Sequence, residues 1–229
     1  MSAPPPLLSG IRACVFDAYG TLFDVSAAAA EAREALGEKS GLLAVLWREK
    51  QLQYTWLRGL QQRHADFLAV TANALTHALA ALGIASPRLH ARLMEVYLRL
   101  PAYPEVPDVL RTLKARGYAT AILSNGTPGM LAAAVESAGL TGLIDKLISV
   151  EEVGVFKPHP RVYQRALVRL GISAGQVSFQ SSNGWDAYAA SAFGMRVVWC
   201  NRSGQADECL PGQPDAIVRS LAALPALLG

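Results

Sequence analysis

The stretch IRACVFDAYGT, residues 11–21, decides how this chain folds. Its first six residues form a short, nearly continuous apolar run, and Asp17 follows that run directly. Such runs are typical of central strands in a parallel sheet, because these strands are buried on both faces. We therefore predict a buried strand that places Asp17 at its carboxyl end.

Further apolar runs follow along the chain, at Ala119–Leu123, Leu147–Val150, Val177–Gln180 and Arg196–Cys200. Segments with helical periodicity lie between most of them, at Pro107–Arg116, Pro128–Ala138, Pro160–Leu170 and Trp185–Phe193. Alternating strands and helices predict an α/β fold, a doubly wound Rossmann-like parallel sheet with right-handed crossovers.

Residues 26–100 break this alternation. They are rich in Ala, Leu, Gln, Glu and Arg, with helical periodicity and no convincing strand. We predict a helical cap subdomain at 26–100, inserted after the first strand, and a Rossmann-like catalytic core made of residues 1–25 and 101–229. The alternative is that these helices belong to the layers of the core.

The composition excludes several classes of function. The chain has 229 residues, 52% of them hydrophobic, and a net charge of only +3 without a basic stripe, so nucleic-acid binding is not expected. It lacks the run of about 18 apolar residues that a membrane span needs, and its start does not resemble a signal peptide. Three cysteines without metal-ligand spacing indicate free thiols in the cytoplasm.

Four polar clusters follow the predicted strands. In an open parallel sheet, ligands bind beyond the carboxyl ends of the strands, so these clusters are expected to converge on one site. They are residues 17–21, Ser124-Asn125-Gly126, Lys157-Pro158 and residues 181–186, which read SSNGWD.

These motifs, FDAYGTLFD at 16–24, LSNG at 123–126, Lys157-Pro158 and SSNGWD, resemble the haloacid dehalogenase superfamily. More closely, they and the cap segment at 46–58 are similar to the type II (S)-2-haloacid dehalogenases. The likeness runs from about residue 11 to about residue 203. It implies hydrolysis of small (S)-2-haloalkanoic acids to (R)-2-hydroxy acids with inversion at C2, without a cofactor, by a homodimer.

Carboxylates that the phosphatases of this superfamily use are missing. Tyr19 stands where those enzymes have the second Asp of Asp-x-Asp, and Ser182-Asn183 replaces an acidic pair, leaving Asp186 alone. Mg²⁺ wants several oxygen ligands with compensating charge, whereas a halide leaves as a weak base without metal or acid. The alternatives are a Mg²⁺-dependent phosphatase, which would want an acid at position 19, and a non-enzymatic binding protein, which would not need Asp17 and Lys157.

The expected chemistry has two steps. Asp17 attacks C2 and expels the halide, leaving an ester on the enzyme, and water then hydrolyses that ester. Lys157 is expected to keep Asp17 ionised and oriented. The alternative for Asp17 is a carboxylate that caps the turn or the next helix.

Hydroxyl and amide side chains are expected to organise the site. Thr21 and Ser181 are candidates for holding the Asp17 carboxylate, and Ser124 for binding the substrate carboxylate. Each of these hydroxyls also fits a local cap of the backbone. Asn183 is a candidate for positioning the water or the carboxylate.

Asp186 is the candidate for activating the hydrolytic water. The alternative is that it holds Lys157 or a backbone group. Tyr163 matches a tyrosine of the resembling family and is expected to donate a hydrogen bond near the nucleophile.

Arg48 and Asn125 are the candidates for a halide cradle, because their N–H groups stabilise an anion that develops in the transition state. Arg48 lies in the predicted cap and would close over the site from above. The remaining candidates are apolar or aromatic residues that wall the pocket: Tyr19, Leu52, Phe67 and Trp185.

Overall fold

Residues 7–229 are described by the computed structural model, apart from three side chains of one helix. Among them, one parallel sheet of six strands has the order β3-β2-β1-β4-β5-β6. The strands are β1 Ala13–Phe16, β2 Ala119–Ser124, β3 Lys146–Ser149, β4 Val177–Ser181, β5 Arg196–Cys200 and β6 Ala216–Val218. From β1 the chain runs outward to β3, then crosses back to β4. The switch point between β1 and β4 is where a doubly wound sheet opens a crevice for ligands.

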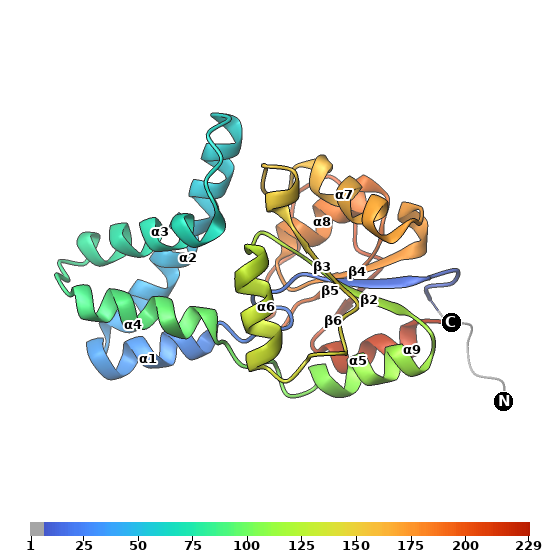
Figure 1. The fold of residues 1–229 in the computed structure, drawn as a ribbon, viewed down its shortest axis with the longest axis horizontal. Helices are drawn as coiled ribbons and strands as arrows, with labels where there is room; N and C mark the ends of the chain where they lie inside the picture. The colour runs from blue at the N-terminus through green and yellow to red at the C-terminus, as the bar shows by residue number, and fades with distance from the viewer. Residues whose placement is uncertain (1–6) are drawn as a thin grey trace.

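Helices cover both faces of this sheet. Figure 1 shows α7 and α8 on one side and α5 and α9 on the other. The helices of this part of the chain are α5 Val106–Ala115, α6 Pro128–Ser137, α7 Pro160–Leu170, α8 Gly184–Phe193 and α9 Leu224–Leu227. β1 is completely buried between the layers, as expected for a central parallel strand. The predicted doubly wound α/β fold is confirmed.

Four further helices lie between β1 and α5 in the sequence, and none of residues 26–100 joins the sheet. Figure 1 shows them together beside the sheet, with one end of α2 rising toward the top of the view. They are α1 Ser26–Leu36, α2 Lys39–Leu60, α3 Phe67–Ala81 and α4 Pro87–Leu98. The α3 and α4 helices begin where Asp66 and Ser86 accept backbone N–H groups of the first turn. We propose residues 26–100 as a cap on a core of 1–25 and 101–229, of which residues 1–6 lie outside the described part.

The two connections between these helices and the sheet run next to each other. The Asp24 N–H donates to the Pro101 carbonyl at 2.8 Å, and the Tyr103 N–H donates to the Leu22 carbonyl at 2.9 Å. This antiparallel pair fixes the helices close to the end of β1, and Arg48 and Leu52 of α2 line a pocket together with Asp17, which follows that strand.

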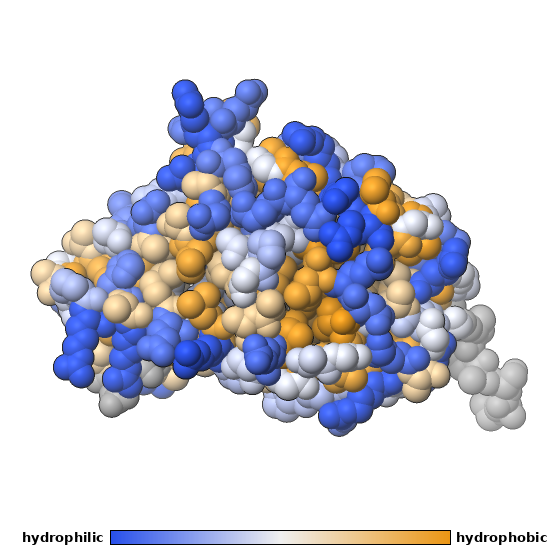
Figure 2. Space-filling model, viewed as in Figure 1, coloured by the Kyte–Doolittle hydropathy of each residue, from blue (hydrophilic) through white to orange (hydrophobic). Residues whose placement is uncertain are grey.

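The surface is mixed in character. Figure 2 shows hydrophobic residues gathered in the middle of one face, around α6 and the edge strand β3, with hydrophilic residues around them. No helix within residues 7–229 is both long enough and apolar enough to cross a membrane. The cytoplasmic location stays a prediction.

Candidate active site

The nucleophile candidate lies at the carboxyl end of the central strand. The backbone N–H of Asp17 donates to the Gln180 carbonyl at 2.8 Å, which extends the pairing of β1 with β4 by one residue. The Asp17 side chain is therefore held at the switch point of the sheet, and only 7% of the residue is exposed. A carboxylate so far removed from water needs partners inside the protein.

Three side chains supply those partners. Lys157 Nζ lies 3.2 Å from Asp17 Oδ1, while Thr21 Oγ1 and Asn183 Nδ2 donate to Oδ2 at 3.2 and 2.9 Å. One cation and two neutral donors thus surround the carboxylate. These contacts supply hydrogen bonds to both carboxylate oxygens and fix their orientation.

Lys157 bridges two carboxylates. Its Nζ lies 2.8 Å from Asp186 Oδ2, and the Tyr163 hydroxyl donates to Asp186 Oδ1 at 2.7 Å. Burial by itself would lower the pKa of Lys157, but the charges of Asp17 and Asp186 raise it above its ordinary value. Burial also raises the pKa of Asp186, with Lys157 opposing and Asp17 adding to the effect. Both Asp186 oxygens already accept hydrogen bonds.

Thr21 and Ser181 differ in what they hold. The Thr21 hydroxyl accepts the backbone N–H of Ser182 at 2.8 Å and donates to Asp17, as predicted for it. The Ser181 hydroxyl instead accepts the backbone N–H of Asn183 at 3.2 Å, so it shapes the turn after β4. The expectation that Ser181 bonds Asp17 is corrected, because this turn uses the hydroxyl two residues before the amide it stabilises.

Two amide side chains of the site are oriented by hydrogen bonds to their oxygens. Asn125 Oδ1 accepts the backbone N–H of Lys157 at 3.0 Å, which leaves its Nδ2 for the pocket. Ser124 ends β2, and its hydroxyl accepts the N–H of Gly126 at 3.1 Å. Asn183 Oδ1 accepts from Arg48, which reaches down from α2, at 2.9 Å.

A small pocket lies where these residues converge, with a volume of about 10 Å³. Tyr19 walls it within an aromatic group, with its ring centroid 5.0 Å from Tyr97 and 6.0 Å from Phe67. All ten lining residues had been singled out from the sequence: Asp17, Tyr19, Arg48, Leu52, Phe67, Ser124, Asn125, Lys157, Asn183 and Trp185. The other four candidates do not line the pocket: Thr21 bonds Asp17, Asp186 bonds Lys157, Ser181 bonds the backbone of Asn183, and Tyr163 bonds Asp186.

A lysine, rather than further acidic side chains, accompanies the two carboxylates of the site. Within residues 7–229, no three or more His, Cys, Asp or Glu side chains form a group that could hold a metal ion. The Lys157 ammonium group lies between Asp17 and Asp186, within 3.2 Å of one and 2.8 Å of the other. It supplies the positive charge that these two carboxylates need.

The side chains that hold the site residues in position were not predicted from the sequence. Ser182 bonds Thr21, and inside the cap Gln51 bonds Arg48 at 2.7 Å. One available signal was spacing, because Gln51 comes three residues after Arg48 and therefore shares its face of the helix.

Comparisons with known proteins agree with this arrangement. Residues 11–194 match the family model described as haloacid dehalogenase-like hydrolase. The chain is 44% identical over 219 residues to (S)-2-haloacid dehalogenase 1 of Pseudomonas sp. (strain CBS-3), covering 95% of this chain and 96% of the relative. It is 42% identical to (S)-2-haloacid dehalogenase 4A of Burkholderia cepacia, covering 88% of each.

A solved structure shows the same likeness in three dimensions. The L-2-haloacid dehalogenase of Xanthobacter autotrophicus with chloropropionic acid covalently bound superposes with a TM-score of 0.88 at 38% identity. The match covers 95% of this chain and 98% of that one. The chain therefore belongs to the haloacid dehalogenase-like hydrolase family.

Proposed function

We propose that this protein is an (S)-2-haloacid dehalogenase, which hydrolyses small (S)-2-haloalkanoic acids to (R)-2-hydroxy acids with inversion at C2. The observation that carries the proposal is the buried Asp17 carboxylate, held by Lys157, Thr21 and Asn183 at a small pocket beneath Arg48. The relatives that share most of its length bear this activity in their names. They do not favour the phosphatase alternative.

In the first step, an oxygen of Asp17 attacks C2 from the side opposite the halogen. A C–O bond forms, the C–halogen bond breaks, and the halide leaves with the bonding electrons. Arg48 and Asn125 present N–H groups that stabilise the developing halide charge, which matters most in the transition state. Ser124 is the hydroxyl that we assign to the substrate carboxylate.

In the second step, water attacks the carbonyl carbon of the Asp17 ester. The C–O bond between that carbon and the acid's oxygen breaks, so the 2-hydroxy acid leaves and the Asp17 carboxylate returns. One proton of the water ends on the hydroxyl of the product, and the other is released to solvent. We assign Asp186 to holding Lys157, because both of its oxygens are engaged by Lys157 and Tyr163 and it is completely buried. Asn183, which touches both Asp17 and Arg48, is placed to orient the water.

We further propose that the reaction needs no metal. EDTA should leave halide release from (S)-2-chloropropionate unchanged, because Lys157 supplies the charge that a cation would bring to Asp17 and Asp186. The (R) acid should release none. Halide is measured by ion chromatography for both acids, with and without EDTA. If no halide appears while Mg²⁺ supports cleavage of p-nitrophenyl phosphate, the protein is a phosphatase.

We also propose that the protein is a homodimer that pairs through α2. Of the ten large hydrophobic side chains that are clearly exposed within the described residues, five lie on this helix: Leu42, Val45, Trp56, Leu57 and Leu60. Exposed apolar side chains gathered on one element are typical of an interface. Leu60 is 82% exposed, so Leu60→Glu should not disturb the folding of the monomer. A Glu at the contact between two protomers should, however, prevent their association. Light scattering should show a dimer for the parent and a monomer for Leu60→Glu, and a monomeric parent would contradict the proposal.

A further inference from the structure

The cap contains a buried polar group to which neither the sequence analysis nor the proposed mechanism gives a role. Gln51 is 1% exposed, Thr71 0% and Tyr97 5%, and they come from α2, α3 and α4. Gln51 Nε2 donates to Thr71 Oγ1 at 2.8 Å and to the Tyr97 hydroxyl oxygen at 3.1 Å. Gln51 Oε1 accepts from Arg48 at 2.7 Å. Polar groups this deeply buried persist where all their hydrogen bonds are made.

The direction of these bonds is determined by Thr71. Its hydroxyl has one hydrogen, which it donates to the Phe67 carbonyl at 2.7 Å. Toward Gln51 it therefore acts only as an acceptor, so the nitrogen of the Gln51 amide faces Thr71. The oxygen of that amide must then face Arg48.

The hydrogen bonds extend to the nucleophile through Arg48, which donates on both sides. One guanidinium nitrogen of Arg48 donates to Gln51, and the other donates to Asn183 Oδ1 at 2.9 Å. Because the oxygen of Asn183 faces Arg48, its nitrogen faces Asp17, to which it donates at 2.9 Å. A continuous chain of hydrogen bonds thus joins the start of α3 to the carboxylate that attacks, and Arg48 is the donor in both directions from its centre.

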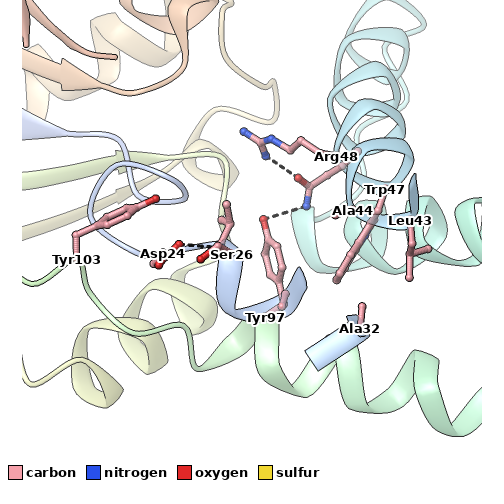
Figure 3. A pocket seen from close by; sticks show the side chains of 12 residues that line it. Asp24, Ser26, Ala32, Leu43, Ala44, Trp47, Arg48, Tyr97 and Tyr103 are labelled. Carbon is pink, nitrogen blue, oxygen red and sulfur yellow. Dashed lines mark hydrogen bonds between the residues drawn. The ribbon is translucent and has the colours of Figure 1, made fainter. Parts of the chain in front are cut away.

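Arg48 has space for a second side-chain position. It also lines a neighbouring cavity of about 240 Å³, much larger than the pocket at Asp17. Figure 3 shows Arg48 and Tyr97 at this cavity, with Asp24 on its opposite side. Without the Gln51 oxygen, the guanidinium would keep only its bond to Asn183, and it would find both space and a carboxylate in this cavity. The Gln51 oxygen opposes that movement.

We propose that Gln51 is a positioning residue, which holds Arg48 over the pocket so that its N–H groups meet the departing halide. The inference rests on the proposed function and deepens it, because it assigns the control of halide stabilisation to a residue that touches no substrate. Gln51 does not line the pocket at Asp17.

The test compares leaving groups. Gln51→Met keeps the approximate volume and removes all three hydrogen bonds. We expect kcat/KM for (S)-2-chloropropionate to fall about tenfold or more, since small misplacements of a group in the transition state have effects of this size. Bromide leaves more readily and depends less on its donors, so the loss for (S)-2-bromopropionate should be severalfold smaller. Both acids give the same ester, so ester hydrolysis does not contribute to the ratio of the two constants, which reports binding together with expulsion of the halide.

A second pair of variants separates positioning from packing. Thr71→Val removes the acceptor that orients Gln51 and should raise the bromide-to-chloride ratio, while Thr71→Ser keeps the hydroxyl and should restore the parental ratio. Thr55→Val is the packing control, because Thr55 is also buried on α2 but its hydroxyl bonds only the Leu52 carbonyl. Thermal unfolding of every variant accompanies the kinetics.

The outcomes are distinct. A raised ratio in Gln51→Met and Thr71→Val, but not in Thr71→Ser or Thr55→Val, supports the inference. Equal losses on both substrates, or an unchanged ratio in both Gln51→Met and Thr71→Val, overturn it while leaving the proposed function intact. A parent enzyme that releases neither halide overturns both.

Discussion

Replacing Asp17 with Asn is expected to abolish halide release. The amide has nearly the same shape, but it lacks the negative charge that makes the carboxylate a nucleophile. Loss of an attacking residue removes the covalent route altogether, so we expect turnover to fall on the order of 10⁴-fold or more. The measurement is chloride release from (S)-2-chloropropionate, followed over hours at high enzyme concentration.

The structure indicates that this variant should still fold. Lys157 keeps Asp186 as a partner at 2.8 Å, so its buried charge stays compensated. Thermal unfolding should therefore show a cooperative transition, and Asp108→Asn, on the exposed surface of α5, serves as a control with parental activity. Release above about one hundredth of the parental rate would mean that a group other than Asp17 attacks C2.

Much of the fold was predictable because its signals are local. The apolar run at 11–16 contains β1. The residue directly after such a run lies at the carboxyl end of its strand in any parallel sheet. The polar residues that follow β1, β2 and β4 meet because those strands are neighbours. The resemblance of the motifs to a known family then indicated which of these side chains take part in the chemistry.

What escaped prediction depends on contacts between distant residues. The edge strand β6, Ala216–Val218, has only three residues and is not buried, so no periodicity marks it. Gln51 bonds residues 20 and 46 positions away, and its role depends on the packing of α2 against α3 and α4. A hydroxyl at the end of a strand can bond either a nearby backbone N–H or a nearby carboxylate. The sequence motif does not distinguish these two partners, so the predicted bond from Ser181 to Asp17 was wrong.

Replacing Asp186 with Asn should also suppress activity strongly, through the charge balance of the first step. With Asp17, Asp186 and Lys157 all ionised, the cluster carries one net negative charge, and this charge leaves with the halide when Asp17 becomes a neutral ester. Lys157 and Asp186 then remain as a neutral pair. In Asp186→Asn the same step would leave Lys157 as an uncompensated buried cation, which is costly in a site that excludes water.

We therefore expect Asp186→Asn to slow ester formation by about 10³-fold or more, since removing one partner of a buried ion pair costs several kcal/mol. Intact-protein mass spectrometry after mixing with substrate should show almost no ester. The alternative role, activation of the hydrolytic water, gives the opposite result, because the ester would form at the parental rate and accumulate.

The pH dependence offers an independent check on Asp186. Its pKa is raised by burial, so the parent should lose activity on acidification at a higher pH than an ordinary aspartate would cause. The direction of this pH effect follows from the charge balance. Protonated Asp186 is neutral, like the side chain of Asp186→Asn, so it leaves Lys157 without its second charged partner. Asp186→Asn has no proton to gain at this position, so its residual ester formation should lack that acid limb. An acid limb identical in parent and variant would assign that limb to another group. The negative charge that compensates Lys157 would then have to come from a residue other than Asp186.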